Sequence, residues 1–88
     1  NQITLLGVEI DGLKNDIIPQ SQEVYIMLKK GYLKGKFSYL EVLEAQNTLF
    51  EFKESYTDTL AEYQKLFFEI KQLTGEIIKG EDYETNYN

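Results

Sequence analysis

The stretch GYLKGKFSYLEVLEAQ, residues 31–46, decides the fold because it contains the end of one helix and the start of another. Gly35 suits the left-handed conformation that follows a helix C-terminus, since glycine has no Cβ to clash there. Lysines precede it, where positive charge is favourable near the negative end of a helix dipole: Lys29, Lys30 and Lys34. We therefore expect a helix to end just before Gly35.

A second helix is predicted to begin shortly after this glycine. Ser38 and Glu41 have the S-x-x-E spacing of a capping box, in which each side chain accepts a hydrogen bond from the other residue's backbone N–H. Phe37 and Val42 flank them at the positions of a hydrophobic staple. A helix, a turn of about four residues and a second helix predict an antiparallel hairpin.

Apolar residues upstream of the turn alternate at spacings of three and four, which is typical of a heptad helix. This seam consists of Ile3, Leu6, Ile10, Leu13, Ile17, Val24 and Met27. Because the register continues across Pro19, we predict one helix over about residues 3–33, kinked where the proline ring clashes with the preceding turn. The alternative is a separate helix with Pro19 in its first turn and Asp16 as its cap.

Apolar residues downstream of the turn recur with a clearer heptad period. Two rows form the seam: Val42, Leu49, Tyr56, Tyr63 and Ile70, and, three residues further on, Ala45, Phe52, Thr59, Leu66 and Leu73. They predict a helix over about residues 38–74, with Gly75 as its C-terminal stop. Residues 76–88 are acidic and unpatterned, so we expect a flexible tail. The predicted fold class is all-α, with residues 1–75 forming a long antiparallel coiled-coil hairpin.

The apolar surface of the second helix is wider than a single hairpin partner can cover. Beyond the seam it includes Leu43, Phe50, Leu60, Phe67 and Phe68. Each large apolar side chain left in water forgoes roughly 1.5–3 kcal/mol of burial free energy. We therefore expect the hairpin to pack against further helices, most simply by associating with itself.

The opposite side of this helix is polar along its whole length. Two adjacent rows, together called the acidic strip, contain Glu41, Thr48, Ser55, Glu62 and Glu69, and Glu44, Glu51, Asp58, Lys65 and Gln72. One interpretation is a solvated face that keeps the protein in solution. The other is the wall of a water-filled lumen whose field favours cations. Composition and periodicity leave both interpretations open.

The composition argues against an enzyme, a nucleic-acid-binding protein and a membrane-spanning helix. The 88 residues contain no histidine and no cysteine, so the usual metal ligands, thiol nucleophiles and general bases are missing. A net charge of -6 does not suit a phosphate backbone, and the longest apolar run, residues 24–28, is too short for a bilayer. Glu41 and Glu44 share a helix face but lack the histidine of carboxylate-bundle metal sites. We predict no catalytic residue, cofactor or metal site.

The order of residues across the turn resembles the C-terminal repeat of the TolC-like outer-membrane efflux proteins. That family has a helix ending in G-Y-x-x-G, a small polar residue, an aliphatic-acidic-Val-Leu-x-Ala-Gln run and a long helix closing near a Thr-Gly or Leu-Gly pair. The matching residues are Gly31, Tyr32, Gly35, Ser38, Leu40, Glu41, Val42, Leu43, Ala45, Gln46, Tyr63, Leu73, Thr74 and Gly75. The resemblance extends over about residues 13–75, and G-K-x-S-x-L-E-V-L-E-A-Q is nearer the heavy-metal efflux branch.

This resemblance implies an architecture and a set of partners. Such proteins are homotrimers, in which each protomer adds strands to an outer-membrane β-barrel and two helical hairpins to a periplasmic α-barrel. The trimer is the exit duct of a tripartite pump for drugs or metal cations, with a periplasmic adaptor protein and an inner-membrane transporter. By this resemblance the chain is one hairpin of the α-barrel, located in the periplasm of a Gram-negative bacterium.

The resemblance also implies site residues at the turn. The periplasmic tip that docks the adaptor and gates the duct corresponds to Gly31, Tyr32, Gly35, Lys36, Phe37 and Ser38. Tyr32 matches a tyrosine that helps to hold the tip closed in related channels. Glu41 and Glu44 occupy the positions of an acidic ring that binds cations at the constriction, although aspartates are common there. Phe37 replaces a basic tip residue of some members, so that contact is not carried over.

The chain lacks other parts of the family pattern, namely the strands, the first repeat and a signal sequence. Its first residue is Asn rather than Met, and we expect it to be a piece of a longer protein. The alternative to a duct component is a structural coiled-coil module without a transport role, in which the acidic strip is only solvated.

Overall fold

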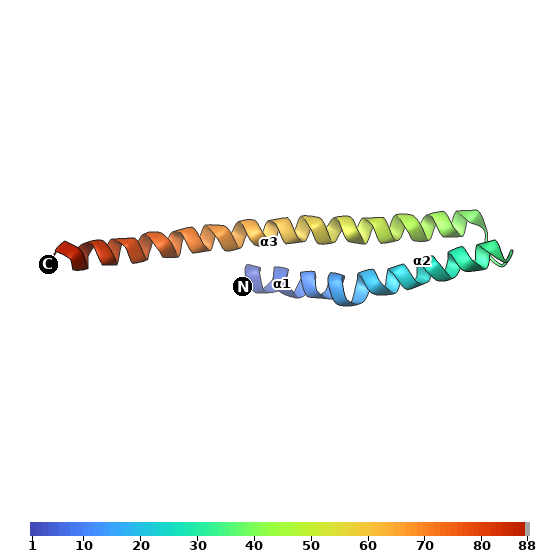
Figure 1. Cartoon of the computed structure of the whole chain (residues 1–88), viewed down its shortest axis with the longest axis horizontal. Coiled ribbons are helices and arrows are strands. Elements are labelled where there is room, and N and C mark those ends of the chain that lie inside the picture. Colours follow the sequence, from blue (N-terminus) through green and yellow to red (C-terminus); the bar gives the residue numbers. More distant parts are fainter. Residues whose placement is uncertain (88) are drawn as a thin grey trace.

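The computed structural model is an all-helical hairpin, and it describes the backbone of residues 1–87 and the side chains of residues 1–75. The first arm consists of α1 (Gln2–Gly12), a single π-helical turn η1 (Leu13–Ile17) and α2 (Ile18–Leu33). The second arm is one long helix, α3 (Tyr39–Tyr87). α1, η1 and α2 all contact α3 (Figure 1), and no strand occurs within residues 1–87. The predicted fold class is therefore confirmed.

The first arm ends in a Schellman motif at the predicted glycine. Gly35 has a φ of +78°, the left-handed conformation expected for it. The backbone N–H of Lys36 donates to the carbonyl of Gly31 at 2.7 Å, and that of Gly35 donates to the carbonyl of Tyr32 at 2.9 Å. These two bonds satisfy carbonyls that the end of α2 would otherwise leave unpaired, and they reverse the chain direction.

The second arm begins with the predicted capping box. The Ser38 N–H donates to Glu41 Oε2 at 3.0 Å, and the Glu41 N–H donates to Ser38 Oγ at 3.2 Å. Because two otherwise unpaired N–H groups are satisfied reciprocally, α3 starts sharply at Tyr39.

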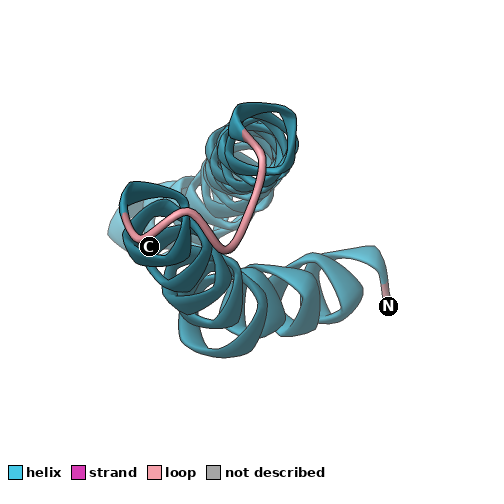
Figure 2. Ribbon diagram, turned by 90° about the vertical axis from the view of Figure 1, so that its right-hand side faces the viewer, coloured by secondary structure: helices cyan, strands magenta, loops and turns pink. Residues whose placement is uncertain are grey.

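The first arm is one continuous right-handed helix with a local widening, rather than two helices. Gly12, Leu13, Ile17 and Ile18 all have φ between -62° and -69°, and the Ile18 N–H donates to the carbonyl of Leu13, five residues back. Ile17, not Asp16, precedes α2, and its side chain forms no capping bond, so the alternative of a separate capped helix is wrong. Figure 2 shows the N-terminal part of this arm swinging away from α2, in agreement with the predicted bend.

The pattern of burial along the first arm changes at the π-helical turn. Before it, the predicted seam residues are buried or half-buried: Ile3, Leu6, Ile10 and Leu13. After it, Ile17, Val24 and Met27 are exposed. The half-buried positions come one residue later, at Ile18, Ser21, Tyr25 and Leu28. Ile17 and Val24 nevertheless line the groove between α2 and α3, together with Ser21 and Leu28, and Gly31 is buried. The predicted register therefore continues across Pro19 in part, with Leu28 in the place expected of Met27, because a π-helical turn holds more residues than an α-helical turn.

The seam of α3 is buried as predicted only where the first arm lies beside it. Val42, Leu49 and Thr59 are buried, and the other members up to Leu66 are half-buried. A Cβ built on Gly7 would lie 3.7 Å from Cε2 of Tyr63, which places the start of the first arm opposite that residue. Further along, Ile70 and Leu73 are exposed, since α3 extends past the beginning of the first arm (Figure 1).

The predicted stop of the second helix at Gly75 is wrong, because α3 continues to Tyr87. Glycine ends a helix by adopting a positive φ, and Gly75 does not, so it costs the helix some stability without terminating it. The predicted flexibility of the tail, residues 76–88, concerns a segment whose side chains lie outside the described residues.

Candidate docking tip and acidic face

The predicted tip residues lie together at one end of the hairpin. Gly31 and Tyr32 belong to the last turn of α2, and the turn itself contains Gly35, Lys36, Phe37 and Ser38. Glu41 and Glu44 follow in the first two turns of α3. The structure therefore brings all of these residues to the closed end of the hairpin, where they could meet a partner approaching along its axis (Figure 1).

Phe37 covers the end of α2 because position 31 has no side chain. Gly31 is buried, and a Cβ built on it would collide with Cδ2 and Cε2 of the Phe37 ring. The half-buried ring thus lies against the backbone of α2, although Phe37 itself belongs to the turn. This contact holds the turn against the end of α2 by apolar packing, in addition to the backbone hydrogen bonds of the Schellman motif.

Two tyrosines form an exposed aromatic pair beside this contact. The ring centroids of Tyr32 and Tyr39 are 5.6 Å apart with an interplanar angle of 51°, a tilted arrangement within the favourable range for aromatic pairs. Tyr32 is 40% exposed and Tyr39 57% exposed, so both rings are accessible. No sequence motif marks Tyr39 as a tip residue, because only the geometry of the turn brings it to Tyr32.

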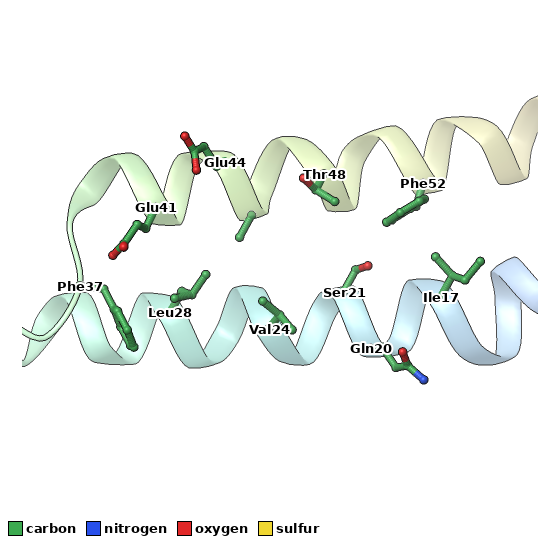
Figure 3. A pocket seen from close by; sticks show the side chains of 11 residues that line it. Ile17, Gln20, Ser21, Val24, Leu28, Phe37, Glu41, Glu44, Thr48 and Phe52 are labelled. Carbon is green, nitrogen blue, oxygen red and sulfur yellow. The ribbon is translucent and has the colours of Figure 1, made fainter.

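A groove of about 620 Å³ runs between α2 and α3, starting at the tip. Its apolar lining is Ile17, Val24, Leu28, Phe37, Ala45 and Phe52, and its polar residues are Gln20, Ser21, Glu41, Glu44 and Thr48. Figure 3 shows Leu28, Val24 and Ser21 directed from α2 toward α3. Ile17 and Val24 on the α2 wall belong to the predicted seam, whereas Ser21 and Leu28 do not.

The two candidate ring glutamates lie at the rim of the groove but in different environments. Glu41 Oε2 is held by the Ser38 N–H, so this carboxylate is directed back toward the turn. Figure 3 shows Glu44 extending away from the first arm. Both residues are exposed. Among the described residues, no group of three or more acidic, histidine or cysteine side chains could hold a metal ion within one chain.

The acidic strip is exposed along its whole predicted length. All ten residues are accessible, from Glu41 near the tip to Gln72 near the far end of the described side chains. Because six of them are acidic and one is basic, this side of the hairpin presents a continuous negative surface. Such a surface attracts cations wherever solvent is confined against it.

Other apolar residues remain exposed beside the seam. Leu43 and Leu60 are half-buried, whereas Phe50, Phe67 and Phe68 are more than half exposed. The hairpin alone therefore leaves the wider apolar surface of α3 largely uncovered, as the sequence predicted. In the described part of the chain, no helix is both long and apolar enough to cross a membrane.

Comparison with known proteins yields one curated relative. The chain is 29% identical over 75 residues to the cobalt-zinc-cadmium resistance protein CzcC of Cupriavidus metallidurans. The matched stretch covers 85% of this chain but only 18% of that protein. No family model matches the chain, and no solved structure matches it significantly.

Proposed function

We propose that this chain is the C-terminal helical hairpin of a TolC-like outer-membrane efflux duct that exports heavy-metal cations. The observation that carries the proposal is its similarity to a cobalt-zinc-cadmium resistance protein over 75 of 88 residues. A match of that length within this chain necessarily includes the turn and both candidate ring glutamates. The all-helical hairpin with a capped, glycine-containing tip is the form that such a duct requires of this segment.

The exposed surfaces of the hairpin support an assembly of several helices. Only four apolar side chains are buried among the described residues: Leu6, Leu13, Val42 and Leu49. A homotrimer in which neighbouring hairpins cover the exposed apolar face of α3 would complete this small core. In the proposed assembly the hairpin lies in the periplasm, and the remaining segments of the longer protein form the outer-membrane barrel.

The tip is the proposed docking and gating site. An adaptor approaching along the hairpin axis would meet Lys36 and the exposed Tyr32–Tyr39 pair first, with the apolar groove opening beside them. Aromatic side chains and an apolar groove with a polar rim suit a helical protein partner. The adaptor would in turn connect the duct to an inner-membrane transporter.

The acidic strip is the proposed lumen wall. In the proposed trimer, the three copies of this hairpin, turned with this strip inward, would form part of the wall of a negative, water-filled path, and Glu41 and Glu44 would form its narrowest ring near the tip. A ring of carboxylates raises the local concentration of divalent cations, which a heavy-metal exporter needs at its entrance. Because the three copies supply the ligands jointly, a single chain needs no complete metal site.

Replacing both ring glutamates tests this proposal. In the full-length protein carrying this hairpin, Glu41→Gln with Glu44→Gln should lower cobalt, zinc or cadmium export and weaken block of the reconstituted channel by these ions. Glutamine is also accepted in a capping box, so the start of α3 should survive the change. The measurements are metal-dependent growth and single-channel conductance.

The matched control removes the same charge elsewhere. Glu23→Gln with Glu54→Gln replaces two exposed glutamates outside the acidic strip and should leave export and block unchanged. Equal behaviour of the two double variants would contradict the ring. It would favour the structural coiled-coil alternative, in which the strip only solvates the helix.

A further inference from the structure

Positive charge is concentrated at the closed end of the hairpin. Residues 24–40 contain four of the nine basic residues and none of the 15 acidic residues, in a chain whose net charge is -6. The four are Lys29, Lys30, Lys34 and Lys36, and all of them are exposed. The negative end of a helix dipole amounts to about half an elementary charge, so four lysines exceed what the C-terminus of α2 needs.

Leu33 lies among these lysines and is 76% exposed. Residues three and four positions apart are neighbours on a helix surface, so Leu33 adjoins Lys30 and Lys29, and Lys34 follows it directly. Ile26, two turns earlier on the same side, is 42% exposed. We call these five residues of α2 the basic face.

The basic face is turned away from α3. Leu28 lines the groove between the arms, and Leu33 is five residues, or about 140°, further round the helix. Gly31 is buried against the Phe37 ring and lies about 160° from Leu33. The basic face is therefore separate from the groove, and the hairpin itself leaves it in solvent.

We propose that the basic face of α2 binds the surface of a membrane that contains anionic phospholipids. Lysine side chains have long apolar stems, so they can lie beside Leu33 among the lipid headgroups while their ammonium groups meet the phosphates. Leu33 itself enters the boundary between headgroups and acyl chains, as the apolar residues of interfacial helices do. This site is additional to the proposed transport role and does not depend on it.

An acidic protein would complement the same charge, but the composition of the basic face favours lipid. The core of a protein interface is depleted of lysine, and its aromatic and aliphatic side chains are clustered. On the basic face, Lys29 and Lys30 lie between the two aliphatic residues, Ile26 and Leu33. Lysines interleaved with aliphatic side chains are instead typical of a helix that contacts a membrane surface.

The remaining charges restrict how the hairpin can approach such a surface. The acidic strip of α3 is repelled by anionic lipid. The acidic residues nearest to the lysines in sequence are Glu23 and Glu41, and the Glu41 carboxylate accepts the Ser38 N–H. The closed end of the hairpin therefore meets the membrane, and the open end points away from it.

Co-sedimentation of the full chain with lipid vesicles tests the proposal. One set of vesicles contains phosphatidylglycerol and phosphatidylcholine in equal parts, and the other contains phosphatidylcholine alone. The chain should bind only the anionic vesicles, and added salt should weaken the binding. Because a net charge of -6 opposes such binding, its occurrence reports a local basic surface. Absence of binding to the anionic vesicles would overturn the proposal.

Replacing the lysines of the basic face should abolish most of this binding. Lys29→Gln with Lys30→Gln and Lys34→Gln should weaken it at least about twentyfold, since each lysine near an anionic surface strengthens binding roughly fivefold. Glutamine is nearly as good a helix former as lysine, so α2 should persist in the circular dichroism spectrum.

The matched control removes three exposed lysines elsewhere, with Lys14→Gln, Lys53→Gln and Lys71→Gln. Both triple variants lose three positive charges, so they have the same net charge and differ only in where the charge is lost. The control should weaken vesicle binding by less than about threefold. An equal loss in the two triple variants would show a general charge effect and would overturn the proposal.

Leu33→Gln tests the apolar part of the contact without changing the charge. It should weaken vesicle binding at least about threefold, because the leucine side chain no longer leaves water. Unchanged binding would contradict the entry of Leu33 into the lipid. If the triple variant lost its helical signal, this single exposed substitution would decide the matter.

Soluble poly-glutamate is the probe for the competing partner. A chain that bound poly-glutamate through the same three lysines but ignored the anionic vesicles would have an acidic protein as its partner, and the lipid proposal would be wrong. Metal export is measured separately and depends on Glu41 and Glu44, so failure of this proposal is distinguishable from failure of the transport role.

Discussion

Gly31 and Gly35 are four residues apart and are required for two unrelated physical reasons. Gly35 needs to be glycine because its φ is +78°, where a side chain is strained. Gly31 has ordinary helical geometry, but the Phe37 ring fills the space that a Cβ would occupy. Glycine is therefore needed at position 35 for its backbone conformation and at position 31 because the Phe37 ring packs there.

Gly31→Ala should consequently destabilise the hairpin, whereas the same change in an open helix stabilises it. We expect a loss of about 1–3 kcal/mol in the free energy of unfolding, the usual cost of overpacking. In a Phe37→Ala background the obstacle is gone, and Gly31→Ala should instead add roughly 0.5–1 kcal/mol. Urea unfolding followed by circular dichroism measures both. The same sign in the two backgrounds would contradict the packing of Phe37 on Gly31.

At the scale of the elements, the two arms differ in how completely their local sequence determines them. α3 has one strong heptad pattern and a capping box, and its structure follows both closely. The first arm has a heptad pattern too, but it contains a π-helical turn before Pro19 that this pattern does not predict. A proline signals a local irregularity in a helix, but it does not specify whether the helix bends, breaks or takes in an extra residue.

The continuation of α3 past Gly75 gives a prediction at this scale. Gly75 has no neighbouring atom within 4 Å of a built Cβ, so Gly75→Ala should raise the helical circular dichroism signal, because alanine costs a helix less entropy. Gly35→Ala is the contrasting variant and should lower stability by about 1–2 kcal/mol because of its positive φ. If both substitutions lowered helicity, the helix would end at Gly75 after all.

At the scale of the whole molecule, the hairpin is long and thin, with extents of 80 × 18 × 16 Å, and it buries little. Many large apolar side chains stay exposed on both arms, including Leu5, Leu33 and Leu40 together with the phenylalanines of α3. Exposed apolar area on this scale is typical of a surface that is covered by a partner. We therefore expect the single chain to be one component of a larger helical assembly.

We predict that the chain associates with itself in solution through this exposed surface. Phe67→Ser with Phe68→Ser should raise the dissociation constant of the assembly at least about tenfold, since each ring contributes well over 1 kcal/mol on burial. Sedimentation equilibrium and light scattering measure the change.

The control for this experiment alters exposed polar residues on the same helix, with Gln64→Ser and Gln72→Ser. It should leave the association constant nearly unchanged. If the chain were strictly monomeric at high concentration, the inference that association buries the exposed apolar side chains of α3 would be wrong.

Much of the fold and part of the candidate site could be predicted from the amino-acid pattern. The turn was predictable because Gly35, Ser38 and Glu41 act through bonds to their immediate neighbours, and such bonds depend on sequence spacing alone. The acidic strip was predictable because helical periodicity places its residues on one side. The places of Ser21 and Leu28 on the groove wall and the Tyr32–Tyr39 pair were not, since both depend on how the two arms meet.

The sequence by itself determined that this protein is a helical hairpin, where it turns and which side of α3 is charged, because these follow from local hydrogen bonding and helical periodicity. Only the tertiary structure decided which residues of α2 line the groove against α3, why Gly31 carries no side chain and where the seam of α3 has no opposing residues. These features depend on packing between the two arms, which the spacing of residues along one arm does not specify.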